Sequence, residues 1–325
     1  MTLLQPLRFT PLLLPKVWGG DRLRRFGKSV RAGDRIGESW EIADLASTSP
    51  SGGGGGAMMS VVAEGAHAGQ TLREVLAELG ESFLGETKLL EGGAFPLLVK
   101  FLDARENLSV QVHPSPQYAR RHPEVHLKSE TWVVLEAEPA SRIYAGLREG
   151  VTTDDLGRAI GDGRVPELLH SFEAEPGMMV DLPSGIVHAL GAGVLVAEVQ
   201  TASDTTFRLF DWGRTDREIH IEQAMECVGD AHALRAGVGH VDHEATMTTD
   251  AYSIECLSID PGTREVTGAT DSCEIVMVLS GEGSLERDGQ SDRLSRGDTL
   301  LVPASWDGLV DAGESELRAI RIRVR

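Results

Sequence analysis

Hydrophobic and polar residues alternate over short stretches along most of the chain. Six such stretches occupy the first two thirds: LLVKFLD, SVQVH, TWVVLEA, MMVDLP, VLVAEVQ and FRLFDW. Four more follow near the C-terminal end: YSIECLSI, EIVMVLSG, TLLVPA and LRAIRIRV. Most are bounded by Gly, Pro, Asp or Ser, which is typical of strands that end in turns. The pattern predicts a mainly β barrel or sandwich rather than alternating strands and helices.

Helical patterns are fewer. The stretch TLREVLAEL opens with the capping-box pair Thr71 and Glu74, and its leucines and valine recur at helical spacing. A second helical patch near residues 152–172 lies between groups of strands. We predict one helix at the first stretch and a small helical insertion at the second.

Two segments far apart in the chain resemble each other. EPGMMVDLPSGIVHAL and SRGDTLLVPASWDGLV both read as turn glycine, apolar strand, proline, short turn and strand, and both resemble the second box of cupin β-barrels. Only the first has a histidine after its proline. We predict two cupin-type (jelly-roll) barrels: a catalytic domain over 1–214 that includes the N-terminal strands and the insertion, a connector over 215–250 with little apolar periodicity, and a metal-free domain over 251–325.

Composition and net charge limit the partners and the cellular location that we expect. The net charge of -19 argues against nucleic acid or an anionic membrane as a partner, because those contacts depend on lysine and arginine facing phosphate. No apolar run approaches the roughly 20 residues of a membrane-spanning helix, and no secretion signal is visible, so we expect a cytoplasmic protein. The three cysteines form no C-x-x-C pair, and the glycine run Ser51–Gly56 lacks the helix and lysine of a phosphate-binding loop. We read that run as a flexible surface loop.

Candidate metal ligands stand in the stretch ENLSVQVHPSP and in two later segments. Gln111 and His113 are two residues apart, so on a strand they point to the same side. Glu130 in KSETW and His188 in SGIVHAL come from later strands of the same predicted barrel. An amide oxygen, two imidazoles and a carboxylate form a mixed set suited to zinc or another first-row divalent ion, with room for water or substrate.

At this point the sequence resembles a known family, the type I mannose-6-phosphate isomerases, which are zinc-dependent cupin enzymes. The resemblance covers essentially the whole chain in six ordered blocks: KVWGG (16–20), IGESWEIA (36–43), FPLLVKFLDARENLSVQVHPS (95–115), KSETW (128–132), LPSGIVHAL (182–190) and EVQTASDTTFRLFDWGR (198–214). The short insertion before the last histidine is similar to the compact bacterial branch. One departure is Ser115, which stands where the family commonly has aspartate and which we read as a turn or helix-cap exchange.

The resemblance implies roles for ten positions. It implies metal ligation by the set Gln111, His113, Glu130 and His188. It implies catalytic roles for Arg208, Glu198 and Lys128. It implies substrate binding by Ser109, Lys128, Arg214 and Lys100. Four of the basic residues, Lys128, Arg208, Arg214 and Lys100, are therefore expected to converge on one positive pocket despite the negative net charge.

The implied reaction interconverts mannose 6-phosphate and fructose 6-phosphate by moving a proton between neighbouring carbons through an enediol. Glu198, water on the metal and a pocket lysine are all candidates for the proton carrier, and the sequence does not choose among them. Arg208 has two competing uses, at the enediolate or at the phosphate.

Two other functions compete with an isomerase. A catalytically idle cupin that binds a sugar or sugar phosphate would have no need of the full metal and acid–base set. A dioxygenase cupin would more naturally use three nitrogens or two histidines and a carboxylate, so Gln111 speaks against it. The expected partner is a phosphosugar, and the sequence leaves the oligomeric state open, a monomer included.

Overall fold

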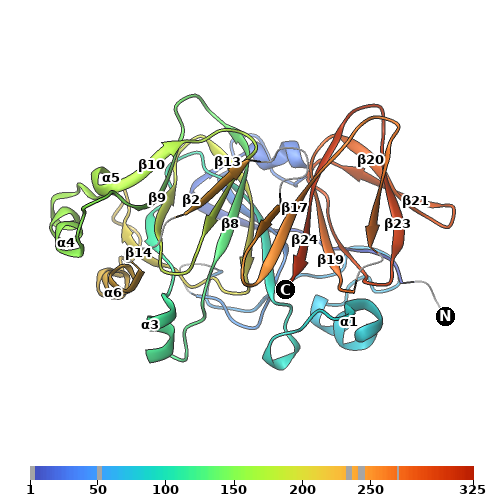
Figure 1. The fold of residues 1–325 in the computed structure, drawn as a ribbon, viewed down its shortest axis with the longest axis horizontal. Coiled ribbons are helices and arrows are strands. Elements are labelled where there is room, and N and C mark those ends of the chain that lie inside the picture. Colours follow the sequence, from blue (N-terminus) through green and yellow to red (C-terminus); the bar gives the residue numbers. More distant parts are fainter. Residues whose placement is uncertain (1–3, 50–52, 232–235, 241–245, 269–270) are drawn as a thin grey trace.

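The computed structural model confirms the mainly β prediction: two β units lie side by side (Figure 1). It describes residues 1–325 except 1–3, 50–52, 232–235, 241–245 and 269–270. Each unit contains two antiparallel sheets that face one another.

The first unit pairs a seven-stranded with a five-stranded sheet. The larger sheet has the order β15 (Gly237–His240), β11 (Met178–Leu182), β8 (Glu130–Ala137), β13 (Val194–Thr201), β6 (Leu97–Asp103), β3 (Ile36–Ile42) and β2 (Leu12–Gly20). The smaller has the order β10 (Leu169–Glu173), β9 (Arg142–Leu147), β12 (Val187–Leu190), β7 (Val110–Val112) and β14 (Phe207–Phe210). Buried side chains such as Trp18, Trp132 and Leu190 fill the space between them.

The second unit repeats this arrangement with a six-stranded and a four-stranded sheet. The six strands run β1 (Leu7–Arg8), β22 (Thr299–Val302), β19 (Glu274–Ser280), β24 (Leu317–Val324), β17 (Tyr252–Ile259) and β16 (Thr246–Thr248). The four strands run β18 (Arg264–Gly268), β23 (Asp307–Ala312), β20 (Glu282–Arg287) and β21 (Gln290–Ser295). The N-terminal strand β1 pairs with β22, so the start of the chain contributes to the second unit. A two-stranded ribbon of β4 (Asp44–Leu45) and β5 (Met58–Met59) stands apart.

The two units pack through the outer faces of their larger sheets. Phe101 and Val199 from the seven-stranded sheet share one buried cluster with Tyr252 and Ile275 from the six-stranded sheet. The second unit therefore buries one face of the sheet whose opposite face belongs to the interior of the first.

Helices cover the remaining apolar faces. The predicted helix is α1 (Leu72–Leu79) with both capping-box hydrogen bonds of Thr71 and Glu74, and α2 (Glu81–Leu84) follows it. The predicted insertion is α4 (Thr153–Asp162) and α5 (Val165–Leu168), although its last residues already belong to β10. Two short 3-10 helices, η1 (Arg22–Phe26) and η2 (Glu91–Gly93), complete the connections.

The segment predicted as a plain connector contains a helix that we did not predict, α6 (Ile221–Ala231). The helical spacing of Ile221, Ala224, Met225 and Val228 is a signal that the connector prediction overlooked. The buried residues of α6 include Ala224, Cys227 and Val228. They join α3 (Pro116–Arg121), α4 and α5 over the outer face of the five-stranded sheet (Figure 1). After α6, β15 pairs with β11 of the first unit, so this stretch also extends the first unit.

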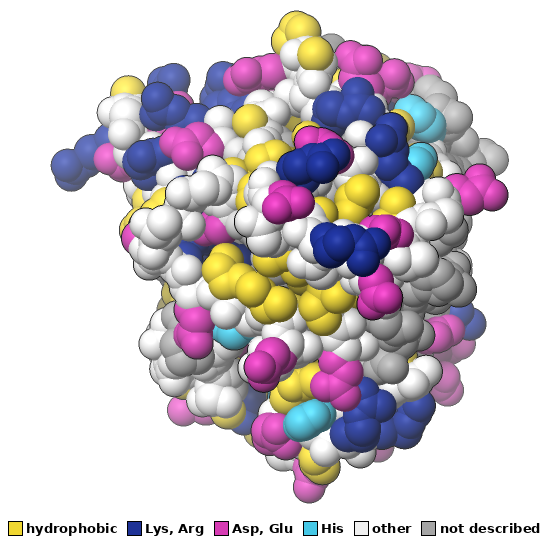
Figure 2. Space-filling model, turned by 90° about the vertical axis from the view of Figure 1, so that its left-hand side faces the viewer, with side chains coloured by type: hydrophobic (Ala, Val, Ile, Leu, Met, Phe, Trp, Pro, Cys, Tyr) yellow, Lys and Arg dark blue, Asp and Glu magenta, His cyan; other side chains and the backbone are white. Residues whose placement is uncertain are grey.

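Several smaller expectations concern the surface. Gly53–Gly56 form an exposed turn, while Ser51 and Gly52 lie outside the described residues. All three cysteines are buried. Among the described residues, no helix has the length and apolarity needed to cross a membrane. On the face next to α4 and α6, lysine and arginine are interspersed with aspartate and glutamate around a central hydrophobic strip (Figure 2).

Candidate metal centre and active site

A row of four directly paired residues crosses the inner face of the seven-stranded sheet. Trp40 on β3 pairs with Lys100 on β6, Lys100 with Glu198 on β13, and Glu198 with Trp132 on β8. Directly opposed residues on neighbouring strands have side chains on the same face. A lysine and a glutamate, flanked by two tryptophans, therefore lie in one line on the inner face of the seven-stranded sheet.

A second row crosses the facing five-stranded sheet. His188 on β12 pairs with Gln111 on β7, and Gln111 pairs with Arg208 on β14. Ser109 and His113 flank Gln111 at two-residue spacing, and the Ser109 hydroxyl donates to the Gln111 amide oxygen at 3.3 Å. The alternating valines between them, in contrast, lie in the cluster under the helices. The predicted strand with one polar face is confirmed.

Where the two rows meet, His113, Glu130 and His188 bring their ligand atoms to within 4.8 Å of one another. All three residues are fully buried. His113 Nε2 lies 3.2 Å from Glu130 Oε2, and His188 Nε2 lies 3.2 Å from Glu130 Oε1. Within the described part of the chain, His113 Nε2 and both Glu130 oxygens lack a partner in hydrogen-bond geometry.

The other nitrogen of each imidazole is already committed. His113 Nδ1 donates to the Thr205 carbonyl at 3.2 Å, and His188 Nδ1 donates to the Ile186 carbonyl at 2.9 Å. Such bonds leave the lone pair of Nε2 directed at the centre, which is how protein carbonyls commonly orient metal-binding histidines. Burial, with help from the Lys128 cation, lowers the pKa of His113 to about 3 and keeps the ring neutral.

Glu130 is held in its anionic form. Burial alone would raise its pKa, but Lys128 and His113 outweigh that effect and keep the pKa of Glu130 well below its usual range. Lys128 Nζ lies 2.9 Å from Glu130 Oε2. Two imidazoles and a carboxylate, all buried, with His113 Nε2 and both Glu130 oxygens lacking a partner among the described residues, fit a divalent ion such as zinc.

Gln111 completes the predicted ligand set. Its amide nitrogen lies 3.2 Å from His188 Nε2, and its oxygen faces Ser109. A half-turn of the amide about the Cγ–Cδ bond brings the oxygen to the side of the histidines. Gln111 thus lies at the centre, and its role as a ligand stays a prediction.

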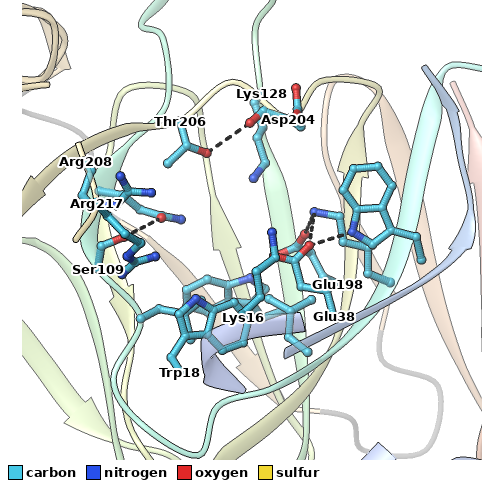
Figure 3. Close-up of a pocket in the computed structure, with 16 residues that line it drawn as sticks. Lys16, Trp18, Glu38, Ser109, Lys128, Glu198, Asp204, Thr206, Arg208 and Arg217 are labelled. Carbon is cyan, nitrogen blue, oxygen red and sulfur yellow. Dashed lines mark hydrogen bonds and ion pairs between the residues drawn. The ribbon is translucent and has the colours of Figure 1, made fainter. Parts of the chain in front are cut away.

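A pocket opens next to this centre and is strongly charged (Figure 3). Its cationic side chains are Lys16, Lys100, Lys128, Arg208 and Arg217, and its anionic ones are Glu38, Glu198 and Asp204. Ser109, Arg208 and Arg217 lie together on one side, with Glu38 and Glu198 opposite. The predicted convergence of basic residues therefore holds for three of the four named, Lys100, Lys128 and Arg208.

Two of the three carboxylates of the pocket, Glu38 and Glu198, are paired with lysines. Lys100 Nζ lies 2.9 Å from Glu198 Oε1 and 3.8 Å from Glu38 Oε2, and Lys16 Nζ lies 3.2 Å from Glu38 Oε1. Burial opposes ionisation at both sites, but the opposite charges prevail: the pKa of Lys100 is raised, and the pKa of Glu38 falls to about 2. The Trp132 indole N–H donates to Glu198 Oε2 at 2.9 Å.

Arg208, Arg214 and Arg217 differ in the partners of their guanidinium groups and in whether they line the pocket. Arg208 is almost fully buried, and its Nε has no hydrogen-bond partner among the described residues. Arg214, predicted to bind substrate, does not line the pocket: its guanidinium donates to the Asp211 carboxylate and to the Asn107 carbonyl, each at 2.7 Å. Arg217 lines the pocket instead and also binds Asp211. Both arginines therefore contact Asp211, but Arg217 and not the predicted Arg214 lines the pocket.

Sequence reasoning gave no site role to several residues that line the pocket, among them Lys16, Trp18, Glu38 and Arg217. The first three stand in the blocks KVWGG and IGESWEIA, from which we predicted no site residue. Alternation was the available signal, because Lys16 and Trp18 are two apart on β2, as Glu38 and Trp40 are on β3. Lysine and glutamate on the buried face of a strand point to a site.

Among the described residues of the second barrel, no such metal-capable group is present. In the repeated motif, Gly308 follows Pro303 at the same spacing at which His188 follows Pro183. The Trp306 ring fills the freed space, since a Cβ on Gly308 would come within 1.8 Å of that ring. His113, Glu130 and His188 are the one such metal-capable group among the described residues.

Ser115 confirms its predicted role as a helix cap. Its hydroxyl accepts from the Tyr118 backbone N–H at 3.0 Å, and Pro116 occupies the first turn of α3. Serine and aspartate are both good N-cap residues, so this exchange leaves the neighbouring His113 in place.

Known proteins resemble the chain over nearly its whole length. A family model described as the catalytic domain of type I phosphomannose isomerase matches residues 14–140. The chain is 34% identical over 311 residues to the mannose-6-phosphate isomerase ManA of Bacillus subtilis strain 168, covering 92% of this chain and 93% of the relative. It is 32% identical to a mannose-6-phosphate isomerase of Streptococcus mutans, covering 93% and 94%.

Solved structures agree on the fold. The crystal structure of the Bacillus subtilis mannose 6-phosphate isomerase superposes with a TM-score of 0.79 at 30% identity, over 98% of this chain and 99% of that one. A putative mannosephosphate isomerase from Archaeoglobus fulgidus gives 0.76 at 23% identity, over 100% of both chains. The predicted architecture of two cupin-type barrels is therefore the fold of these relatives.

Proposed function

The chain belongs to the type I phosphomannose isomerase family, and from this premise we propose that it interconverts mannose 6-phosphate and fructose 6-phosphate. The observation that carries the proposal is the buried group of His113, Glu130 and His188, which opens onto a charged pocket. A sugar phosphate matches such a pocket, since it offers hydroxyls and a carbonyl to the centre and a dianion to the arginines.

His113, Glu130 and His188 would hold the ion, which we propose to be zinc, with Gln111 as a fourth ligand. When bound, zinc polarises a sugar oxygen and stabilises negative charge that develops on it. The protein orients these side chains. The Thr205 and Ile186 carbonyls accept hydrogen bonds from the two imidazoles, and Lys128 Nζ lies 2.9 Å from Glu130 Oε2.

Glu198 is the proposed proton carrier between the two sugar carbons. Its Oε2 is held by the Trp132 N–H, whereas Oε1 lies 2.9 Å from Lys100 without hydrogen-bond geometry and so keeps a lone pair toward the pocket. Glu38 is less suited, because lysines on both sides hold its pKa at about 2. A base works best when its pKa lies near the operating pH.

Lys128 and Arg208 are proposed to stabilise the oxygens of the enediolate. Lys128 reaches into the pocket beside the metal centre, and the unsatisfied Nε of Arg208 is a donor that a substrate oxygen can accept from (Figure 3). Charge-assisted hydrogen bonds of this kind are roughly twice as strong as neutral ones.

The phosphate is proposed to lie on the side of Ser109 and Arg217. Ser109 offers a hydroxyl there, and Arg217 is less buried than Arg208, which suits the solvated end of the substrate. Lys100 acts on substrate through Glu198, to which it is paired. We propose no direct substrate contact for Arg214, since its guanidinium is engaged elsewhere.

The test is a coupled assay of purified protein with mannose 6-phosphate, in which fructose 6-phosphate formation is followed with and without a chelator. We expect turnover that disappears with the chelator and returns with zinc. Binding of the sugar phosphate with no turnover in the zinc-loaded protein would instead favour the non-catalytic cupin. A cytoplasmic location and the absence of nucleic-acid and membrane partners stay predictions.

A further inference from the structure

Two strands connect the metal centre to the second barrel. Glu130 on β8 and Glu198 on β13 face the pocket, whereas the next residue of each, Thr131 and Val199, faces the opposite side of the sheet. Thr131 and Val199 are directly paired, and Val199 belongs to the cluster shared with the second barrel. Any shift of these two strands moves the carboxylates on the other face.

A tyrosine of the second barrel reaches this point. Tyr252, the first residue of β17, is fully buried, and its hydroxyl donates to the Val199 carbonyl at 2.9 Å. The Tyr252 hydroxyl oxygen also lies 3.0 Å from Thr131 Oγ1. Thr131 Oγ1 in turn lies 3.3 Å from the Asp181 carboxylate on β11. One phenol thus joins β8 and β13 at the residues that follow Glu130 and Glu198.

We propose that Tyr252 is a positioning residue of the isomerase site, through which the metal-free second barrel fixes the aim of Glu130 and Glu198. The proposal rests on the function proposed above. Phenylalanine would fill the same space in this apolar interface, so a role in packing alone does not require the hydroxyl. Burying a polar group without a partner is unfavourable, so the two hydrogen bonds keep the phenol in one place. Burial raises the pKa of Tyr252, and the hydroxyl stays a donor.

The test compares Tyr252→Phe with a control that removes a different hydroxyl between the barrels. Thr87 Oγ1 accepts from the Cys273 backbone N–H at 3.2 Å, and both residues lie outside the pocket. Thr87→Val keeps the shape and loses this bond. For each variant we would measure the Tm, the affinity for zinc in a competition titration with a chromophoric chelator, and kcat and KM.

We expect both variants to lose thermal stability and only Tyr252→Phe to lose function. Its affinity for zinc and its kcat should each fall about tenfold, a typical effect of residues that orient metal ligands, with KM within twofold of the wild-type value. Thr87→Val should keep kcat and zinc affinity within twofold. If Tyr252→Phe loses only stability, as the control does, the positioning role is wrong.

A second variant disrupts the same contact between Tyr252 and Thr131, which we call the bridge, from the side of the first barrel. Thr131→Val removes the hydroxyl that contacts Tyr252, and it serves as the test if Tyr252→Phe does not fold. The double variant should be no worse than the more impaired single variant, because both remove one bridge; fully additive losses would contradict it. If the wild type shows no turnover, the proposed isomerase function fails, whereas unchanged zinc affinity in both single variants refutes the bridge itself.

Discussion

Lys100→Met is the substitution that tests most directly how the pocket is stabilised. Lys100 is 5% exposed, and its ammonium lies 2.9 Å from Glu198, 3.8 Å from Glu38 and 2.7 Å from the Gln200 amide oxygen. Methionine preserves most of the volume and removes the charge. Glu38 then keeps Lys16 at 3.2 Å, but Glu198 keeps the Trp132 N–H without a cation.

The magnitude follows from these distances. At an effective dielectric constant of about 20, the Coulomb attraction of a pair is roughly 6 kcal/mol at 2.9 Å and roughly 4 kcal/mol at 3.8 Å. Desolvation of several kcal/mol per ion offsets much of this in the intact protein. In the variant, Glu198 still bears its desolvation without the attraction, so we expect the free energy of unfolding to fall by about 3–5 kcal/mol.

Urea unfolding at pH 7, followed by tryptophan fluorescence, measures this loss. The double variant Lys100→Met/Glu198→Gln should recover most of it, because no uncompensated charge then stays buried. The control is Arg164→Met, which breaks the exposed ion pair with Glu167 and should leave the midpoint unchanged. A loss below about 1 kcal/mol in the single variant, or a double variant as unstable as the single one, would refute the reasoning.

Three further predictions concern the site. His113→Ala should lose bound zinc and turnover together, measured by metal analysis and the coupled assay; full zinc occupancy would contradict its role as a ligand. Arg208→Ala should retain zinc and lose most of its kcat, whereas Arg214→Ala should keep kcat within a few-fold; a reversed order would exchange their roles. The depressed pKa of Glu38, about 2 against 4.5, stabilises the protein above pH 4.5, and this contribution is lost as the pH falls toward 2. Between pH 7 and 3.5 the wild type should therefore lose about 1.4 kcal/mol more than Glu38→Gln in urea unfolding, and parallel pH profiles would exclude the pairing.

The grouping of the candidate metal ligands could be predicted because these residues follow strand periodicity. Gln111 and His113 share one face of a strand by their spacing alone, and Glu130 and His188 stand at fixed places in short motifs. The fold class followed from the same alternation. In both cases the signal is local in the chain, and burial of the apolar face turns it into a three-dimensional prediction.

The charged pocket was less predictable, since its pairing partners are distant in sequence. Lys16 and Glu38 meet because β2 and β3 pair next to β6, a register that no local pattern specifies. Arg214 and Arg217 both contact Asp211, and the sequence does not indicate which of the two guanidinium groups lines the pocket. The helix α6, by contrast, was predictable, because Ile221, Ala224, Met225 and Val228 recur at helical spacing.

The charges of the pocket bear on substrate choice. The chain carries a net charge of -19, yet the pocket is lined by five cationic and three anionic side chains. Each anion is engaged: Glu38 and Glu198 with lysines, and Asp204 with the backbone N–H groups of Ser49 and Gly53. Of the five cations, Lys16, Lys100, Lys128 and Arg217 each have a carboxylate partner, so Arg208 is the pocket cation without an ion pair among the described residues, and a bound divalent ion would add positive charge. A phosphate carries about -1.5 to -2 at neutral pH and can balance this excess, whereas free mannose leaves it buried and uncompensated. The pocket therefore favours a phosphorylated sugar over the free hexose on electrostatic grounds alone.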